Sequence, residues 1–216
     1  MFAATHVGRD HVRVGRNNQD GAFSSENVVV VTDGCGSQPQ SEVGAQLGAR
    51  FLGEWLSSRE LDATLPERAV DALTRWLDAL SLTLQSGERG RLLESFFLFT
   101  FLAAVRRADD VIVFGMGDGS VCIDGRLITL DVGDDNAPNY AAYRLTSSSP
   151  PPVVTHFTGR ASQVVLMTDG LSTVRADELW SPGLSRNPFS LQRRLNVLAA
   201  RERLHDDATI AILGGA

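Results

Sequence analysis

The stretch NVVVVTDG, residues 27–34, decides the fold. Its four consecutive valines are β-branched, and the run is too short for a typical helix, so we expect a strand that is buried on both faces. The strand ends on Asp33-Gly34. A carboxylate that ends a core strand is costly to bury without a partner, so Asp33 needs an explanation beyond its place in a turn.

Two amphipathic helices are predicted after this strand. From Glu42 to Leu56, apolar residues recur near helical spacing, namely Val43, Leu47, Leu52 and Leu56. From Pro66 to Leu84 a longer apolar pattern repeats in the same way, and a proline suits the first turn of a helix.

The rest of the chain predicts mainly antiparallel sheet. Short runs of β-branched or aromatic residues are separated by turn residues, and Asp124-Gly125 between two apolar runs is a strong hairpin signal. Strands are expected over residues 95–105, 110–114, 120–130, 163–167 and 208–213, and a helix over 191–204. Because the strands are grouped apart from the helices, we expect an α+β fold in which helices cover sheets.

Length and composition favour one domain over residues 1–216. The chain has 216 residues, of which 43% are hydrophobic, enough for one sizeable core. A net charge of -6 gives no basic face for a phosphate backbone, so nucleic acid is not expected as a partner. Two cysteines are too few for a disulfide framework, which favours a cytoplasmic location. We expect no export signal and no membrane role, because the most apolar run, residues 96–105, is shorter than the roughly 20 residues of a spanning helix.

Three predicted core strands end in the same way, as VVVVTDG at 28–34, VFGMGDG at 113–119 and VVLMTDG at 164–170. A single Asp-Gly pair is typical of an ordinary turn. If Asp33, Asp118 and Asp169 converge, however, their charges repel, and a hard cation such as Mg²⁺ or Mn²⁺ would relieve the repulsion. The pair Asp206-Asp207 opens the last predicted strand and adds a fourth carboxylate position.

This ligand chemistry points to phosphoryl transfer. Two divalent cations a few ångströms apart activate a water molecule and stabilise an in-line displacement at phosphorus. The phosphate oxygens also need a basic group, and an arginine guanidinium suits them. Arg16 lies four residues before Asp20, and Arg13 is nearby. The sequence therefore predicts a metal-dependent phosphohydrolase and leaves the choice between the two arginines open.

Five motifs together resemble the metal-dependent protein phosphatase family of the protein phosphatase 2C type, in its compact bacterial form. The resemblance covers nearly the whole chain and implies an α/β/β/α sandwich of two mainly antiparallel sheets, with metals in a cleft between them. The motifs are RNNQDG at 16–21, VVTDGCGSQPQSEVGA at 30–45, GMGDGSV at 115–121, LMTDGL at 166–171 and HDDATIAIL at 205–213.

The resemblance also implies a set of metal ligands. Asp33 would bridge two ions, the Gly34 carbonyl would bind one of them, and Asp169 and Asp206 would bind the other. Asp118 would help to hold a third, weaker ion. The cofactor would be Mn²⁺ or Mg²⁺.

Further roles follow from the RNNQDG motif. Asp20 and Gln19 would orient metal-bound waters, and Arg16 would bind the substrate phosphate. The family's arginine usually stands five residues before the aspartate, where this chain has Gly15. Cys35 follows the first metal motif in place of the usual residues, so no histidine general acid is present at that point.

The implied reaction is hydrolysis of phosphoserine or phosphothreonine in a phosphorylated protein. A serine/threonine kinase pathway would supply the substrate, and the phosphatase would act in signalling as a monomer.

Three alternatives remain. The chain could be a catalytically weak or inactive phosphatase-like domain that binds a regulatory partner, or a phosphatase of small phosphate esters. Cys35 invites comparison with thiol phosphatases, but the arginine that would close their phosphate loop corresponds to Ser41 here. The four histidines are scattered, and only His205, beside Asp206, merits a test.

Overall fold

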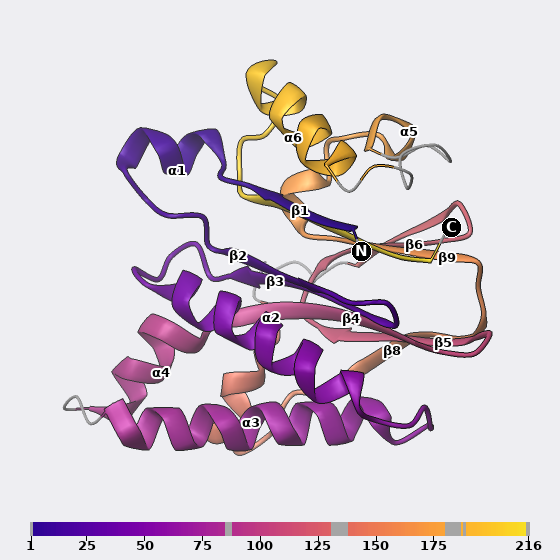
Figure 1. Ribbon diagram of the computed structural model, residues 1–216. Helices are drawn as coiled ribbons and strands as arrows, with labels where there is room; N and C mark the ends of the chain where they lie inside the picture. Colours follow the sequence, from indigo (N-terminus) through magenta and orange to yellow (C-terminus); the bar gives the residue numbers. More distant parts are fainter. Residues whose placement is uncertain (1, 85–87, 131–137, 180–186, 188, 215–216) are drawn as a thin grey trace.

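The computed structural model describes residues 2–84, 88–130, 138–179, 187 and 189–214. Two five-stranded antiparallel sheets lie face to face, and helices cover both outer faces (Figure 1). One sheet has the strand order β1-β10-β9-β6-β7 and the other β2-β3-β4-β5-β8. The predicted α+β fold, an α/β/β/α sandwich, is confirmed.

The chain passes between the two sheets several times: β1, β6, β7, β9 and β10 belong to one sheet, and β2 to β5 and β8 to the other. The strands are β1 (Phe2–His6), β2 (Asp20–Ser24), β3 (Val28–Gly34), β4 (Phe99–Arg107), β5 (Asp110–Met116), β6 (Gly119–Ile123), β7 (Arg126–Leu130), β8 (Val154–Arg160), β9 (Gln163–Met167) and β10 (Ala208–Gly214). The helices are α1 (Arg9–Val14), α2 (Ser41–Ser57), α3 (Leu65–Leu84), α4 (Arg89–Phe97), α5 (Ala176–Leu179) and α6 (Ser190–Ala200), with short 3-10 helices η1 (Ala141–Leu145) and η2 (Asp169–Leu171).

The valine run lies at the centre of the sandwich, as β3. Val28 and Val30 belong to the apolar core under the helices, whereas Val29 and Val31 belong to the core between the two sheets. All four side chains are at most 1% exposed. Successive side chains of a strand point to opposite faces, so an uninterrupted apolar run is what a strand covered on both faces requires.

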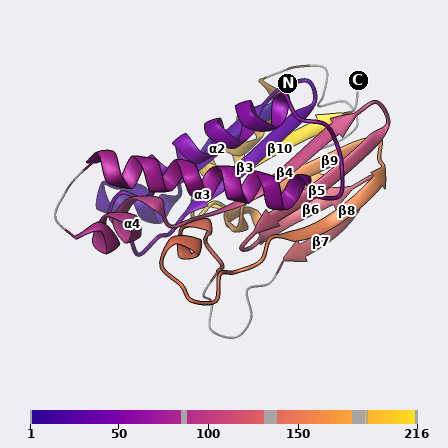
Figure 2. The same ribbon diagram turned by 90° about the horizontal axis from the view of Figure 1, so that it is seen from below.

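The helices form two separate outer layers. Helices α2, α3 and α4 cover the sheet that contains β3, as Figure 2 shows from below, and the other layer contains α5 and α6. The predicted apolar face of α2 is buried only in part: Leu52 and Leu56 are buried, whereas Val43 and Leu47 are 38% and 47% exposed. Gly44 and Gly48 also belong to the buried face. A Cβ on Gly44 would lie 2.0 Å from the Phe96 carbonyl oxygen, so close packing against α4 requires glycine there.

Two predicted boundaries were wrong. Residues 95–97, expected in a strand, form the end of α4, where Phe97 faces the core. The helix expected to reach Leu204 ends at Ala200, because Glu202 has a φ of 55° and the Arg203 amide donates back to the Leu198 carbonyl. Strands β1, β2 and β8 and helices α1, α4 and α5 were not predicted.

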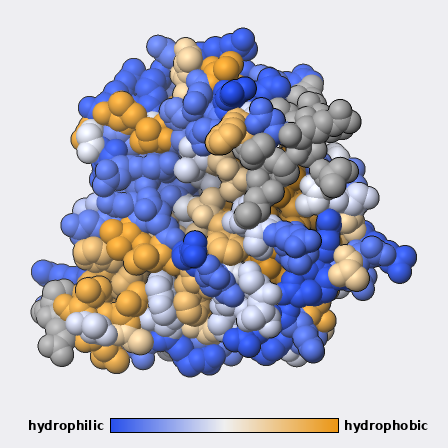
Figure 3. Space-filling view, in the orientation of Figure 1, coloured by the Kyte–Doolittle hydropathy of each residue, from blue (hydrophilic) through white to orange (hydrophobic). Residues whose placement is uncertain are grey.

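Surface hydrophobicity is divided into patches. Figure 3 shows apolar side chains over α1 and, lower on the same face, over α2 and α4, with polar residues between the two patches. Val12 and Val14 of α1 are 59% and 69% exposed. None of the described helices has the length and apolar character needed to cross a membrane.

Candidate metal centre

A cavity of about 370 Å³ lies where the two sheets end together. Segments far apart in the sequence meet there: α1, the start of β2, the end of β3, the β5–β6 link, η2 and the start of β10. The described lining residues are His11, Gln19, Asp33, Gly34, Cys35, Gly36, Ser37, Thr100, Asp118, Pro138, Tyr140, Asp169, Asp206 and Asp207.

The expected metal-binding residues therefore share one cavity. Asp33 and Gly34 end β3, and Asp118 lies between β5 and β6. Asp169 begins η2, and Asp206 precedes β10. By contrast, Asp124 lies in the β6–β7 hairpin, where it accepts hydrogen bonds from backbone amides, as an ordinary turn residue does.

Burial and neighbouring carboxylates raise the pKa of Asp33, Asp118 and Asp206. Burial raises the pKa of Asp33 well above its ordinary value, and the charges of Asp20 and Asp169 raise it further. Burial is also the main cause of the raised pKa of Asp118 and Asp206, with Asp169 contributing in both cases. Without a cation, ionising this cluster is therefore unfavourable.

Asp20 is buried next to the cavity residue Asp33. It pairs with Asp33 across β2 and β3 and is only 2% exposed. The Thr168 hydroxyl donates to Asp20 Oδ2 over 2.8 Å. Burial nevertheless raises the pKa of Asp20 well above its ordinary range, against hydrogen bonds from Thr209 and Thr168 that lower it.

Gln19 lines the cavity and has one unused acceptor. Its Nε2 donates to the Gln38 carbonyl over 3.0 Å and to Ser41 Oγ over 2.7 Å. Gln19 Oε1 and Asp20 Oδ1 are buried, and no described residue hydrogen-bonds to either atom. Buried acceptors without donors, beside carboxylates with raised pKa values, fit hard divalent cations and their bound water. The residues present thus fit the expected metals.

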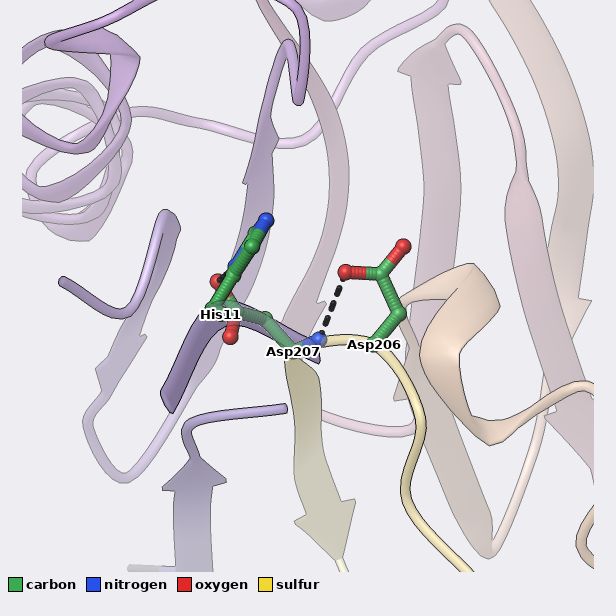
Figure 4. Close-up of side chains that lie close together, drawn as sticks. All are labelled: His11, Asp206 and Asp207. Atoms are coloured by element: carbon green, nitrogen blue, oxygen red, sulfur yellow. Dashed lines mark hydrogen bonds and ion pairs between the residues drawn. The ribbon is translucent and has the colours of Figure 1, made fainter. Parts of the chain in front are cut away.

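His11 and Asp207 were not among the predicted site residues. A side-chain atom from each of His11, Asp206 and Asp207 lies within 4.8 Å of the others (Figure 4). Asp206 is exposed and accepts a hydrogen bond from the Asp207 amide over 2.8 Å. Asp207 is buried and contacts His11. His205, the histidine that the sequence singled out for a test, is exposed, and its Nδ1 forms a hydrogen bond with the Arg9 guanidinium.

The two arginine candidates differ in position. Arg16 donates to the carbonyl of Gly36, a residue that lines the cavity. Arg13 lies on α1, where its guanidinium is 3.5 Å from an Asp10 carboxylate oxygen. Arg16 is therefore the arginine nearer the cavity rim.

Cys35 also lines the cavity, but its surroundings do not form a thiol-phosphatase loop. Its Sγ lies 3.2 Å from Ser37 Oγ. The position where such a loop would need arginine is Ser41, a buried residue that donates to the Cys35 carbonyl.

Two facing sheets that end together at a carboxylate-lined cavity define an α/β/β/α sandwich whose cavity is suited to divalent cations. The model of the protein phosphatase 2C family matches residues 7–207. The chain therefore belongs to the protein phosphatase 2C family.

Solved structures show the same fold at low identity. The Mycobacterium tuberculosis serine/threonine phosphatase PstP/Ppp is 19% identical, with a TM-score of 0.67 and 98% of each chain covered. The catalytic domain of the phosphatase PstP in complex with two manganese ions is 16% identical, with a TM-score of 0.63, covering 97% of this chain and 95% of that one. Staphylococcus aureus Stp1 is 13% identical, with a TM-score of 0.65, covering 99% and 93%. No curated protein matches the sequence.

Proposed function

We propose that the protein is a metal-dependent serine/threonine protein phosphatase formed by a single domain over residues 1–216. The observation that carries this proposal is the meeting of Asp33, Asp118, Asp169 and Asp206 in one cavity of a protein phosphatase 2C chain. When bound, a pair of Mn²⁺ or Mg²⁺ ions supplies Lewis acidity and activates water for attack on phosphorus.

Each proposed ligand has a place around the cavity. Asp33 would bridge the two ions, the Gly34 carbonyl would bind one, and Asp169 and Asp206 would bind the other. Asp118 would help to hold a third ion. The PstP structure contains two manganese ions, which supports a binuclear centre here.

The remaining residues orient water and substrate. Gln19 presents its unused Oε1, and Asp20 its unused Oδ1, to hold water. Arg16 binds the substrate phosphate at the rim of the cavity, because a guanidinium can donate hydrogen bonds to two phosphate oxygens at once.

The substrate is proposed to be a phosphoserine or phosphothreonine side chain of a protein, made by a serine/threonine kinase of a bacterial signalling pathway. Solved relatives named as serine/threonine phosphatases support this substrate class. The enzyme is proposed to act as a monomer, and its two free cysteines agree with a cytoplasmic location.

Hydrolysis assays with Mn²⁺ test the function. The wild-type protein should hydrolyse a phosphothreonine peptide and an aryl phosphate, and EDTA should abolish both activities. Asp33→Asn and Asp169→Asn should lower kcat at least about a hundredfold, because metals contribute several kcal/mol and each 1.4 kcal/mol is about tenfold in rate.

Asp124→Asn is the matched control, because Asp124 belongs to an Asp-Gly pair outside the cavity and should leave the rate unchanged. Hydrolysis of the aryl phosphate alone would indicate a phosphatase of small esters. A wild-type protein that hydrolyses neither substrate would favour the alternative of an inactive phosphatase-like binding module.

A further inference from the structure

Asp207 joins the N-terminal segment to the start of β10. Its Oδ1 accepts a hydrogen bond from the Gly8 amide over 2.7 Å, and its Oδ2 accepts one from the Gln19 amide over 2.5 Å. The side chain is 3% exposed. A Cβ on Gly8 would lie 2.3 Å from the Asp206 carbonyl carbon, so only glycine allows this approach. The segment that carries α1 is thereby held against the cavity.

The third group on this carboxylate is the His11 ring. His11 Nδ1 lies 2.9 Å from Asp207 Oδ2, and the side chain is 14% exposed. A carboxylate oxygen only accepts, so Nδ1 carries the proton and the ring orientation is set. Figure 4 shows the other ring nitrogen, Nε2, pointing away from Asp207. No described residue hydrogen-bonds to Nε2, and the ring lines the cavity.

A cation held by His11, Asp206 and Asp207 is a competing interpretation of this cluster. The hydrogen bonds argue against it, because both Asp207 oxygens already accept from backbone amides and one also accepts from His11. These three donors compensate the buried charge of Asp207 without a metal.

The charges of the side chains that line the cavity distinguish His11 from the other lining residues. Most charged side chains that line it are carboxylates, which repel a phosphate. Among the described lining residues, His11 is the one side chain that can carry a positive charge. Arg16 contacts Gly36 at the rim but is not among those lining residues. Of the lining residues that the structure describes, His11 is therefore the one that can offer a cationic donor to a phosphate inside the cavity.

We propose that His11 contacts the substrate phosphate through Nε2, and that Asp207 is the residue that positions it. In the imidazolium form, Nδ1–H donates to Asp207 and Nε2–H donates to a phosphoryl oxygen. This inference rests on the proposed phosphatase function, and it adds a contact inside the cavity to that of Arg16 at the rim.

Three substitutions of His11 distinguish the role of Nε2 from that of Nδ1. Gln places its amide nitrogen at about the reach of Nε2, Asn reaches only as far as Nδ1, and Ala removes both groups. In Mn²⁺-loaded protein, His11→Ala and His11→Asn should bind inorganic phosphate about tenfold or more weakly by calorimetry, the effect of losing a charged hydrogen bond. KM for a phosphothreonine peptide should rise in parallel. In His11→Gln both the phosphate affinity and the KM should stay closer to the wild-type values than in the other two variants.

Metal titrations of the same proteins complete the test. Mn²⁺ affinity should be unchanged in all three variants, whereas a uniform loss would make His11 a metal ligand and overturn the proposal. If His11→Asn behaved as wild type while His11→Gln failed, the ring would serve only the Asp207 contact, which would also overturn it.

The inference and the proposed function fail separately. Wild-type protein that hydrolyses the peptide, with variants that bind phosphate equally well, would refute the His11 contact alone. Wild-type protein that binds phosphate through His11 but hydrolyses nothing would refute the function and support the contact. Wild-type protein that neither binds phosphate nor hydrolyses would refute both.

Discussion

At the scale of single residues, the carboxyl groups around the cavity connect metal binding to stability. The pKa values of Asp20, Asp33, Asp118 and Asp206 are all raised, with burial as the main cause. The unfolded chain releases its aspartate protons above a pKa of about 3.9. At the same pH, the folded protein without metal still holds some of these protons. Rising pH then favours the unfolded state until it passes the folded pKa values.

This linkage predicts a pH dependence that cations remove. In EDTA, the urea midpoint of unfolding should fall as pH rises above the unfolded pKa of about 4, for example between about 5 and 8. In Mn²⁺ the midpoint should stay higher and vary less, because the ions compensate the carboxylates. The fall should be smaller in Asp33→Asn than in wild type. An equal fall with and without Mn²⁺ would contradict the interpretation.

The sequence predicts only part of the site at this scale. Asp33, Asp118 and Asp169 can be found because each follows a strand whose apolar pattern marks it as core. His11 and Asp207 cannot, because a lone histidine in a short exposed helix has no periodic signal. Their contact joins positions 196 residues apart, which only the folded chain brings together. The one hint was the placement of Asp207 beside a predicted ligand.

At the scale of elements, pattern strength decides what could be predicted. Strand β3 was found because it is an uninterrupted β-branched run, and helix α3 because its many buried side chains recur with helical spacing. Helix α1 has no buried residue, and β8 is largely exposed or half-buried, so neither has a strong apolar pattern. On α2 the pattern was right for Leu52 and Leu56 but not for Val43 and Leu47, because glycine and alanine fill the buried face in the first half of the helix.

A pair of glycines tests the packing of α2 against α4. Gly44→Ala should lower the free energy of unfolding by about 1–3 kcal/mol, because the new Cβ meets the Phe96 carbonyl and overpacking outweighs the gain in helix propensity. Gly90→Ala, in α4, has nothing within 4 Å and should be neutral or stabilising by up to about 1 kcal/mol. Urea unfolding compares them, and equal effects at both positions would refute the close contact.

At the scale of the whole molecule, the sandwich brings both ends of the chain to one cavity. β1 pairs with β10, so the segment carrying His11 and Gln19 lies beside the loop carrying Asp206. β3 and β9 bring Asp33 and Asp169 to the same end from opposite sheets. The general architecture follows from strand and helix patterns and from the family resemblance. The pairing of strands distant in sequence is set by packing of the complete chain.

The central claim is that this meeting point holds divalent cations, and a calorimetric Mn²⁺ titration of metal-free protein tests it most directly. The wild-type protein should bind about two ions per chain, as a binuclear hydrolytic centre requires. Asp33→Asn should lose most of this binding, and Asp124→Asn should titrate like wild type. A wild-type protein that binds no Mn²⁺, or an Asp33→Asn protein that binds it equally well, would contradict the claim.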